Sequence, residues 1–268
     1  MRSYRDLVLA LRKLELDGSR PVIAHASLKS FGKVSGGAEA VLGALLEHFG
    51  TVVMPTFTYK TMIVPEDGPP NNAIEYGAME DANRMAAFYH EDMPADKLMG
   101  VIAETLRQHR DARRSKHPIL SFSGVNAEEI LEEQEIDEPF APISAMAEQD
   151  GWVLLLGVSH RVNTSIHLGE RLAGRKTFVR WALMPDMVVK CSNFPSCSDG
   201  FDDIRASVAP FTHSIRVGSA LVQAVPLQEL IDTARQLVQA NPLALLCERP
   251  DCPRCNAVRD EVRKIKQT

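Results

Sequence analysis

His167 and Glu170 are the residues of this chain whose types and spacing best fit acid–base chemistry. A spacing of three residues on a short helix places both side chains on one face. A neutral imidazole beside a carboxylate can serve as a general base, because the carboxylate fixes the tautomer and the orientation of the ring. The alternative is that His160 and His167 are only polar residues at the end of a strand.

Both histidines belong to a polar segment that directly follows a short apolar run. Residues 152–158 come after a glycine and consist of Trp, Val, Leu and one further Gly, which is typical of a fully buried strand. Ligands of open α/β sheets bind at the carboxyl ends of strands. We therefore expect the chemistry of this protein where this strand ends.

The sequence HASLKSFGKVSGG, residues 25–37, has the composition of an anion-binding loop. Gly36 and Gly37 would let backbone amides at a helix N-terminus approach a ligand, where the helix dipole favours negative charge. The loop matches neither the Walker A pattern nor G-x-G-x-x-G, so binding of a nucleoside triphosphate or a dinucleotide is not indicated, while a pyrophosphate-bearing cofactor such as coenzyme A stays open. The alternative is a turn that glycine permits, with solvated lysines beside it.

A basic segment, RRSKHP, occupies residues 113–118, before a predicted short strand with the sequence ILSFSG. Its arginines, serine and lysine could hold phosphates, and the proline holds His117 extended. In isolation we favour the simpler interpretation, which is a run of charge on a solvated face.

All five cysteines lie in the last third of the chain. An odd number of cysteines without a signal peptide argues against a disulfide framework. The C-x2-C pair of Cys252 and Cys255, next to a proline, resembles half of a structural zinc site, and a site made of cysteine alone needs four thiolates. We favour Cys197, Cys252 and Cys255 with either Cys191 or Cys247.

Such a closed zinc site would leave no position for a substrate. The metal would therefore staple the C-terminal segment and would not take part in catalysis. The alternative is that the thiols are reduced and that the C-x2-C spacing is a coincidence. A redox pair is less favoured, because no thioredoxin-like context surrounds the motif.

Hydrophobic periodicity predicts alternating helices and strands in the first part of the chain. Residues 4–16 and 36–50 carry apolar residues at helical spacing, and Ser35 is a candidate N-cap for the second helix. The predicted strands are residues 21–27 and 51–57. A strand, loop, helix and strand in succession favour a right-handed parallel crossover.

The rest of the chain mixes a long loop with further helices and strands. The loop, residues 60–96, is rich in Pro, Gly, Asn and Met, and a loop of this length in a compact domain is usually functional. We expect a helix at 98–110 with Val101 inward, short helices in 126–150 broken at Pro139 and Pro142, strands at 186–191 and 214–226, and a last long helix at 227–238.

The bulk composition of the 268 residues excludes several classes of protein. A hydrophobic fraction of 45% and a charged fraction of 24% are ordinary for a globular protein. The formal net charge of −5 argues against a nucleic-acid partner. No apolar run reaches the length of a membrane span and the N-terminal residues do not resemble a secretory signal, so we expect a cytoplasmic protein without a membrane partner.

Five segments of the chain, in order, are similar to those of one known family. They are HASLKSFGKVSGGAEAVLGALL, TVVMPTFTY, MGVIAETLRQHRDARRSKHPILSFSG, EPFAPISAMAEQDGWVLLLGV and NTSIHLGE. Together they resemble the aminoglycoside 3-N-acetyltransferase family of antibiotic acetyltransferases, which is unrelated to the GNAT enzymes. The resemblance covers about residues 5–260, and its most specific signatures are H-x-S-L…G-G, R-S-x-H-P and N-T-x-x-H-L-x-E.

The resemblance implies one α/β domain over residues 1–268, with a central mixed, partly parallel sheet flanked by helices and a cysteine-rich C-terminal segment. It also implies transfer of acetyl from acetyl-coenzyme A to a small-molecule amine, first of all the 3-amino group of a 2-deoxystreptamine aminoglycoside, and so antibiotic resistance. The acceptor ammonium must lose a proton before it attacks the thioester, so a base is needed, whereas an acyl-enzyme is not.

Residue roles follow from the matching motifs. The catalytic histidine of the family maps onto His167, paired with Glu170, and His25 faces the reaction centre. Thr58 or backbone amides could hold the developing oxyanion. The cofactor contacts map onto Ser27, Leu28, Lys29, Ser30, Gly32, Lys33, Val34, Ser35, Gly36, Gly37, Thr58 and Ser115, and the acceptor contacts are assigned to Asn72, Glu75, Tyr76, His160 and Asn163.

One departure from the family pattern concerns the acceptor. Many members carry His-Asp where this chain has His160-Arg161, and Arg161 would repel a cationic aminoglycoside if it faced the cleft. The loop at 60–96 offers acids that could bind amines or could simply face solvent, namely Glu66, Asp67, Glu75, Glu80 and Asp81.

Three other functions stay open at this point. The first is an acyl-coenzyme A transferase that acts on a non-antibiotic amine and shares every cofactor residue. The second is a zinc-stapled module that binds a protein or nucleic acid, although the acidic pI counts against nucleic acid. A metallohydrolase that uses His160, His167 and Glu170 ranks last, because the chain has no H-E-x-x-H arrangement.

Overall fold

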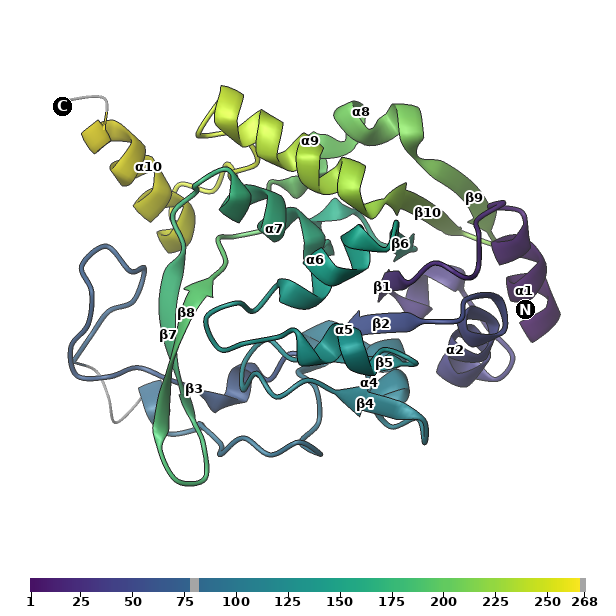
Figure 1. The fold of residues 1–268 in the computed structure, drawn as a ribbon, viewed down its shortest axis with the longest axis horizontal. Coiled ribbons are helices and arrows are strands. Elements are labelled where there is room, and N and C mark those ends of the chain that lie inside the picture. The colour runs from purple at the N-terminus through teal and green to yellow at the C-terminus, as the bar shows by residue number, and fades with distance from the viewer. Residues whose placement is uncertain (78–81, 266–268) are drawn as a thin grey trace.

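A seven-stranded sheet forms the centre of the computed structural model, which describes residues 1–77 and 82–265 (Figure 1). Its strands are β1 (Val22–Ala26), β2 (Val52–Pro55), β4 (Ala112–Arg114), β5 (Phe122–Val125), β6 (Trp152–Leu156), β9 (His213–Val217) and β10 (Ala220–Pro226). The strand order is β4-β5-β2-β1-β6-β10-β9. β1 pairs in parallel with β2 and β6, while the other pairs are antiparallel. The sheet is therefore mixed and partly parallel, as expected.

Helices cover both faces of this sheet, because its central strands are apolar on both sides. The helices are α1 (Tyr4–Arg12), α2 (Gly37–His48), α4 (Val101–Arg107), α5 (Glu128–Glu132), α6 (Ala141–Glu148), α7 (Ser165–Leu172) and α9 (Leu227–Ala240). Val22 and Ala24 of β1 pack into a core with α1, α2 and α4, whereas Ile23 packs into a second core with α5, α6, α7 and α9. This is the alternation that a strand imposes on its side chains.

A smaller sheet of three antiparallel strands, in the order β3-β7-β8, stands at one side of the main sheet (Figure 1). Its strands are β3 (Met62–Ile63), β7 (Phe178–Leu183) and β8 (Val188–Phe194), and the helix α10 (Pro253–Ile265) lies at the same side (Figure 1). Further short helices are η1 (Leu28–Phe31), η2 (Tyr59–Thr61), η3 (Lys97–Met99), η4 (His160–Val162), η5 (Phe201–Ile204), α8 (Arg205–Val208) and η6 (Ala209–Phe211). In the described ranges, no helix is long and apolar enough to cross a membrane.

Two expectations about helix starts are wrong because glycines set the backbone there. Gly100 has a φ of 84°, so the helix expected at 98–110 divides into η3 and α4, and Val101 is 53% exposed instead of inward. Ser35 does not cap α2, since Gly36 takes that place with a φ of 81°. Both values lie in the left-handed region that glycine adopts without strain.

Two further differences concern the middle and the end of the chain. Pro142 does not break a helix, because it lies in the first turn of α6, where a missing N–H costs no hydrogen bond. Helix α10 was not expected at all. Its sequence is rich in charged residues and it buries only Cys255, Ala257 and Val258, so its apolar stripe is too narrow to indicate a helix.

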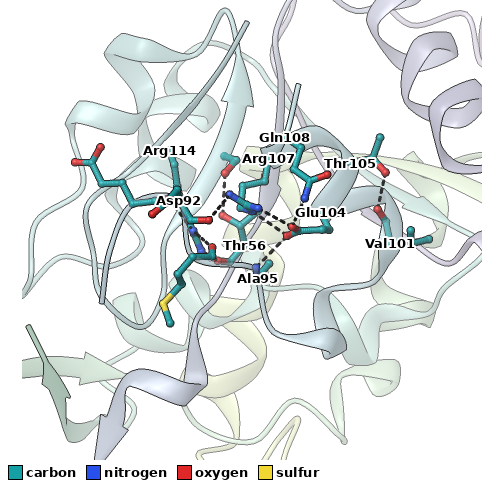
Figure 2. Close-up of polar contacts among 12 residues, drawn as sticks. Thr56, Asp92, Ala95, Val101, Glu104, Thr105, Arg107, Gln108 and Arg114 are labelled. Carbon is teal, nitrogen blue, oxygen red and sulfur yellow. Dashed lines mark hydrogen bonds and ion pairs between the residues drawn. The ribbon is translucent and has the colours of Figure 1, made fainter. Parts of the chain in front are cut away.

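Arg114, in the basic segment after α4, connects β4 to the end of β2 (Figure 2). Its guanidinium donates to the backbone oxygens of Met93 and Thr56, both at 2.5 Å. Beside it, Arg107 forms an ion pair with Glu104 at 2.6 Å (Figure 2). Arg114 therefore links β4 to the residues around Met93 and to the end of β2, and it is not part of a solvated face.

His117, in the same segment, also has a structural role. It is buried, and its Nδ1 accepts hydrogen bonds from the backbone N–H groups of Ile119 at 3.1 Å and Leu120 at 3.0 Å. Burial lowers the pKa of His117 to about 4, so the ring is neutral and can accept at pH 7. The R-S-x-H-P signature thus shapes the turn that leads into β5.

Replacing Arg114 with alanine should leave the carbonyl oxygen of Met93 without this donor and the carbonyl oxygen of Thr56 with the Ser121 hydroxyl alone. We expect Arg114→Ala to lower the free energy of unfolding by about 3 kcal/mol. Arg113 is exposed on the same strand, and Arg113→Ala should change it by less than about 0.5 kcal/mol. Urea unfolding followed by circular dichroism measures both variants, and equal losses would contradict this role of Arg114.

Candidate active site

A cleft of about 740 Å³ opens where β1 and β6 end. Its walls come from six parts of the chain: the end of β1 and the residues after it, the end of β2 and the residues after it, the turn before α4, the turn before α7, the segment after β8, and α10. This is the edge of the sheet at which the sequence predicts chemistry. Polar and charged side chains on the wall include His25, Ser27, Lys29, Arg161, Asn163, Thr164, His167, Ser196, Ser198, Asp199 and Arg254.

His25 lies near the end of β1 on the same face of the sheet as α7. It follows Ile23 by two residues, and Ile23 packs into the core that contains α7. The side chain is buried, and its Nε2 has no hydrogen-bond partner in the part of the chain that the structure describes. Burial and the nearby His160 lower the pKa of His25 to about 3, so the ring is neutral at pH 7.

His167 and Glu170 lie side by side on α7. The distance from His167 Nδ1 to Glu170 Oε2 is 2.8 Å, and both side chains are buried. Since an ionised carboxylate can only accept, Nδ1 carries the proton and Nε2 has a free lone pair. Phe140 stacks on the imidazole at 5.9 Å and Phe201 meets it edge-on at 4.7 Å between ring centroids, which fixes the ring plane. An imidazole held in this way on the wall of the cleft can act chemically as a general base.

Glu170 accepts hydrogen bonds from two further side chains that sequence reasoning missed. Arg175 Nη1 donates to Oε1 at 2.5 Å, and Ser196 Oγ donates to Oε2 at 2.7 Å. Arg175 is held in turn by the carbonyl oxygens of Pro242 and Ala244. Ser196 is 26 residues from Glu170 and Arg175 follows the end of α7, so no helical spacing could reveal either contact.

His160 and Asn163, which are expected to contact the acceptor, contact each other. Asn163 Nδ2 lies 3.2 Å from His160 Nδ1, and Asn163 Oδ1 accepts from the N–H of Ser165 at 3.2 Å, where α7 begins. Burial lowers the pKa of His160 to about 4. Asn163 lines the cleft, whereas His160 is fully buried and does not line it. Of these two residues, only Asn163 therefore lines the cleft.

Of the loop expected to bind the cofactor, residues 27–37, only the first residues line the cleft. Ser27, Leu28 and Lys29 line it, and Ser27, Lys29 and Ser30 also line a neighbouring groove of about 700 Å³. The later part of the loop is held against the N-terminus by backbone hydrogen bonds to Arg2. Six of the expected residues consequently line neither hollow, namely Gly32, Lys33, Val34, Ser35, Gly36 and Gly37.

Thr58 and Ser115 are not brought to the cleft either. Thr58 Oγ1 donates to the carbonyl oxygen of Pro118 at 2.6 Å, and Ser115 Oγ accepts from the N–H of Phe122 at 2.8 Å. Both residues are buried and neither is part of the cleft wall. Their hydroxyl groups are engaged in the local turns of the fold.

Asn72 and Tyr76 lie against the smaller sheet, and neither they nor Glu75 line the cleft. The Asn72 side chain accepts from the N–H of Val179 at 2.9 Å and donates to its carbonyl oxygen at 3.0 Å and to Tyr76 Oη at 2.7 Å. Tyr76 packs edge-on against Trp181. Glu75 is exposed, as are Glu66 and Asp67, while Glu80 and Asp81 lie outside the described residues.

Arg161 does face the cleft, where its charge is shared with an acid. Its Nη2 lies 3.1 Å from Asp199 Oδ1, and Arg249 Nη2 lies 2.9 Å from the other oxygen of the same carboxylate. Asp199 is the only carboxylate among the described residues of the cleft wall. Two arginines thus offset the one negative charge that a cationic acceptor would meet here.

Four cysteines converge next to the segment that carries Ser196. The sulfur atoms all lie within 4.8 Å of one another, and the side chains are buried. Four converging thiols are the ligand set of a closed tetrahedral zinc site. Cys191 does not join them, because it lies on β8 with its sulfur near the carbonyl oxygen of Val189. The four are Cys197, Cys247, Cys252 and Cys255.

Comparison with known proteins places this geometry in a family. The sequence model of the family described as aminoglycoside 3-N-acetyltransferase matches residues 23–239. A prophage-derived aminoglycoside N(3')-acetyltransferase-like protein of Bacillus subtilis, YokD, is 30% identical over 177 residues, which are 63% of this chain and 65% of that protein. Aminoglycoside N(3)-acetyltransferase IX of Micromonospora chalcea is 32% identical over 174 residues, 61% of this chain and 59% of the relative. The chain thus matches less than two thirds of the length of either relative.

Solved structures share the fold. The crystal structure of YokD from Bacillus subtilis has a TM-score of 0.79 at 24% identity and covers 90% of this chain and 100% of its own. A variant of AAC(3)-IVa in complex with gentamicin has a TM-score of 0.77 at 22% identity over 97% of each chain. AAC-IIIb in complex with CoASH has a TM-score of 0.74 at 19% identity and covers 89% of this chain and 96% of its own. Because the family match extends over most of its length, the chain belongs to the aminoglycoside 3-N-acetyltransferase family.

Proposed function

We propose that residues 1–268 form a single acetyltransferase domain that moves acetyl from acetyl-coenzyme A to an amine. The observation that carries the proposal is the His167–Glu170 pair on the wall of the cleft that Ser27 and Lys29 also line. Family membership supports the same reaction, since a relative at 32% identity is named an aminoglycoside N(3)-acetyltransferase.

His167 acts as the general base of this reaction. Its Nε2 accepts a proton from the acceptor ammonium, which frees the nitrogen lone pair for attack on the carbonyl carbon of the thioester. As the C–N bond forms, the C–S bond breaks and the nitrogen loses its second proton. The thiolate that leaves takes one of the two protons, and the other passes to solvent. Glu170 keeps the proton on Nδ1 and offsets the positive charge that the ring gains. Proton transfer by a positioned side chain of this kind typically contributes about 10²–10⁴-fold to the rate.

Coenzyme A fits the part of the cleft that follows β1. When bound, acetyl-coenzyme A supplies an acetyl group that is already activated as a thioester. Ser27 offers a hydroxyl group, and Lys29 and Arg254 offer positive charge, which suits an anionic cofactor. A structural neighbour in complex with CoASH supports this assignment.

His25 is the second polar group of this centre. Its buried Nε2 lacks a partner in the described ranges, and a bound group that reaches this atom would satisfy it. Because its pKa is lowered to about 3, His25 is neutral at pH 7 and can form this bond without adding a charge. It therefore orients a ligand and does not compete with His167 for the proton.

The acceptor that we propose is the 3-amino group of a 2-deoxystreptamine aminoglycoside, which implies a role in antibiotic resistance. The name of the Micromonospora relative and the neighbour bound to gentamicin support this acceptor. Thiol release from acetyl-coenzyme A, measured with kanamycin-, gentamicin- and neomycin-type acceptors, tests it. Acceptor-dependent release supports the proposal, and coenzyme A binding without any release would contradict this acceptor class.

A second candidate acceptor is a non-antibiotic amine of lower positive charge. Arg161 favours it, since Arg161 and Arg249 offset the charge of Asp199 on the cleft wall. A polycation would meet like charge at this point, and like charges placed together reduce affinity. Thiol release with monoamines but not with aminoglycosides would favour a non-antibiotic amine as the acceptor.

Removing the imidazole of His167 should abolish turnover. We expect His167→Ala to lower kcat at least about 100-fold and to change the Kd of coenzyme A by less than about threefold, because a base acts on the transition state more than on cofactor binding. His90 is exposed, so His90→Ala is the control that should leave kcat unchanged. Steady-state kinetics and calorimetry measure both quantities, and an unchanged kcat in His167→Ala would remove His167 from its role.

Reversing the charge of Lys29 should weaken cofactor binding. Lys29 lines the cleft, so Lys29→Glu should raise the Kd of coenzyme A about tenfold at low salt and less at high salt. Lys33 is exposed and lines neither hollow, which makes Lys33→Glu a control with the same change in charge. Titration calorimetry at two salt concentrations compares them, and equal effects would contradict a cofactor contact at Lys29.

A further inference from the structure

We propose that Cys197, Cys247, Cys252 and Cys255 bind one zinc ion, and that this ion positions Ser196 against Glu170. The metal then acts on catalysis through Ser196, a positioning residue, without touching the substrate. The second half of this inference rests on the proposed acetyl transfer, whereas the first half does not.

The ligand chemistry favours zinc. A zinc ion bound to four thiolates at about 2.3 Å keeps the sulfur atoms roughly 3.8 Å apart. In this chain the four sulfur atoms lie within 4.8 Å of one another, and those of Cys247 and Cys255 are 3.4 Å apart. The set therefore needs only small movements to surround the ion.

Hydrogen-bond donors lie next to the sulfur of Cys197, as a negatively charged cluster of thiolates requires. The backbone N–H of Asp199 lies 3.5 Å from the sulfur of Cys197, and Arg249 Nη2 lies 3.9 Å from the same sulfur. Hydrogen bonds of this kind hold metal-bound thiolates and offset their charge. The cluster thus has charge compensation as well as ligands.

The cluster also holds the segment that contacts the active site. Cys197 directly follows Ser196, whose hydroxyl donates to Glu170 at 2.7 Å. Arg254, which lies between Cys252 and Cys255, donates to the carbonyl oxygen of Ser196 at 2.9 Å and lines the cleft. One ion would therefore hold Ser196 in two ways. Its ligand Cys197 is the next residue in the chain, and Arg254, between two further ligands, donates to the carbonyl oxygen of Ser196.

Loss of the ion has a direct structural consequence. Four buried thiolates without a metal are costly, and thiols take up less well-defined positions than ligands around an ion. The segment around Ser196 would then lose its anchor, and Glu170 would lose one of its three side-chain donors. We expect a less ordered imidazole at His167 and a lower kcat.

The metal itself is tested first, by plasma mass spectrometry of protein purified without chelator. We expect about one zinc ion per chain in the wild type and in Cys191→Ser, whose thiol lies outside the cluster. Cys247→Ser should lose most of its zinc. A wild type without zinc, or with iron in its place, would overturn the assignment, whether or not the protein transfers acetyl.

The positioning role is tested on the zinc-loaded protein. Ser196→Ala should keep its zinc and lower kcat about tenfold with little change in KM for acetyl-coenzyme A, while Ser196→Thr restores much of the rate because it keeps the hydroxyl. Ser192, on β8, is a control outside the cleft wall, and Ser192→Ala should behave as the wild type. An unchanged kcat in Ser196→Ala would overturn the positioning role.

A readout without turnover separates this inference from the proposed function. Carbethoxylation of His167 by diethyl pyrocarbonate, located by mass spectrometry, should become at least about threefold faster in Ser196→Ala and in zinc-stripped wild type, since a loosened ring reacts faster. Zinc added back should reverse the change in the stripped protein. Equal rates in all forms would overturn the coupling, while a zinc-dependent rate in a protein that acetylates no amine would contradict only the proposed function.

Discussion

The buried carboxylate of Glu170 is the constraint on which the site depends. A charge in the interior is stable only when other groups pair with it, and breaking such a pair costs about 3–5 kcal/mol. Here the partners are His167, Arg175 and Ser196, which come from α7, from the residues after it and from the segment after β8. The need to satisfy one carboxylate therefore fixes three parts of the chain relative to one another, and it holds one nitrogen of the imidazole while the other stays free.

The sheet explains why this group lies next to the loop that follows β1. β1 and β6 run in parallel as neighbours, so the loop that follows β1 and the turn that leads to α7 leave the sheet at the same edge. His25 comes from the first strand and His167 from the helix that follows the second, and both line the cleft. A cofactor and an acceptor bound in this cleft would lie between two elements that are rigid because both are packed into the cores.

Local patterns and the shared chemistry of the cysteines predicted much of this arrangement, whereas the hydrogen bonds between distant segments could not be predicted. The spacing of His167 and Glu170 and the apolar run of β6 are visible in the sequence. The C-x2-C pair indicated a four-cysteine site, although the choice between Cys191 and Cys247 needed the fold. Ser196 was missed because its bond to Glu170 spans 26 residues. Motif matching could not show that the hydroxyl of Thr58, which is assigned to the cofactor site by resemblance, donates to the carbonyl oxygen of Pro118.

The most direct test of the central claim is a crystal structure of the protein with coenzyme A and an acceptor that is turned over. The account predicts the acceptor nitrogen within hydrogen-bond distance of His167 Nε2, about 2.6–3.2 Å, with the cofactor sulfur in the same cleft beside the residues that follow β1. An acceptor amine that lies away from His167, or a cofactor bound outside this cleft, would contradict it.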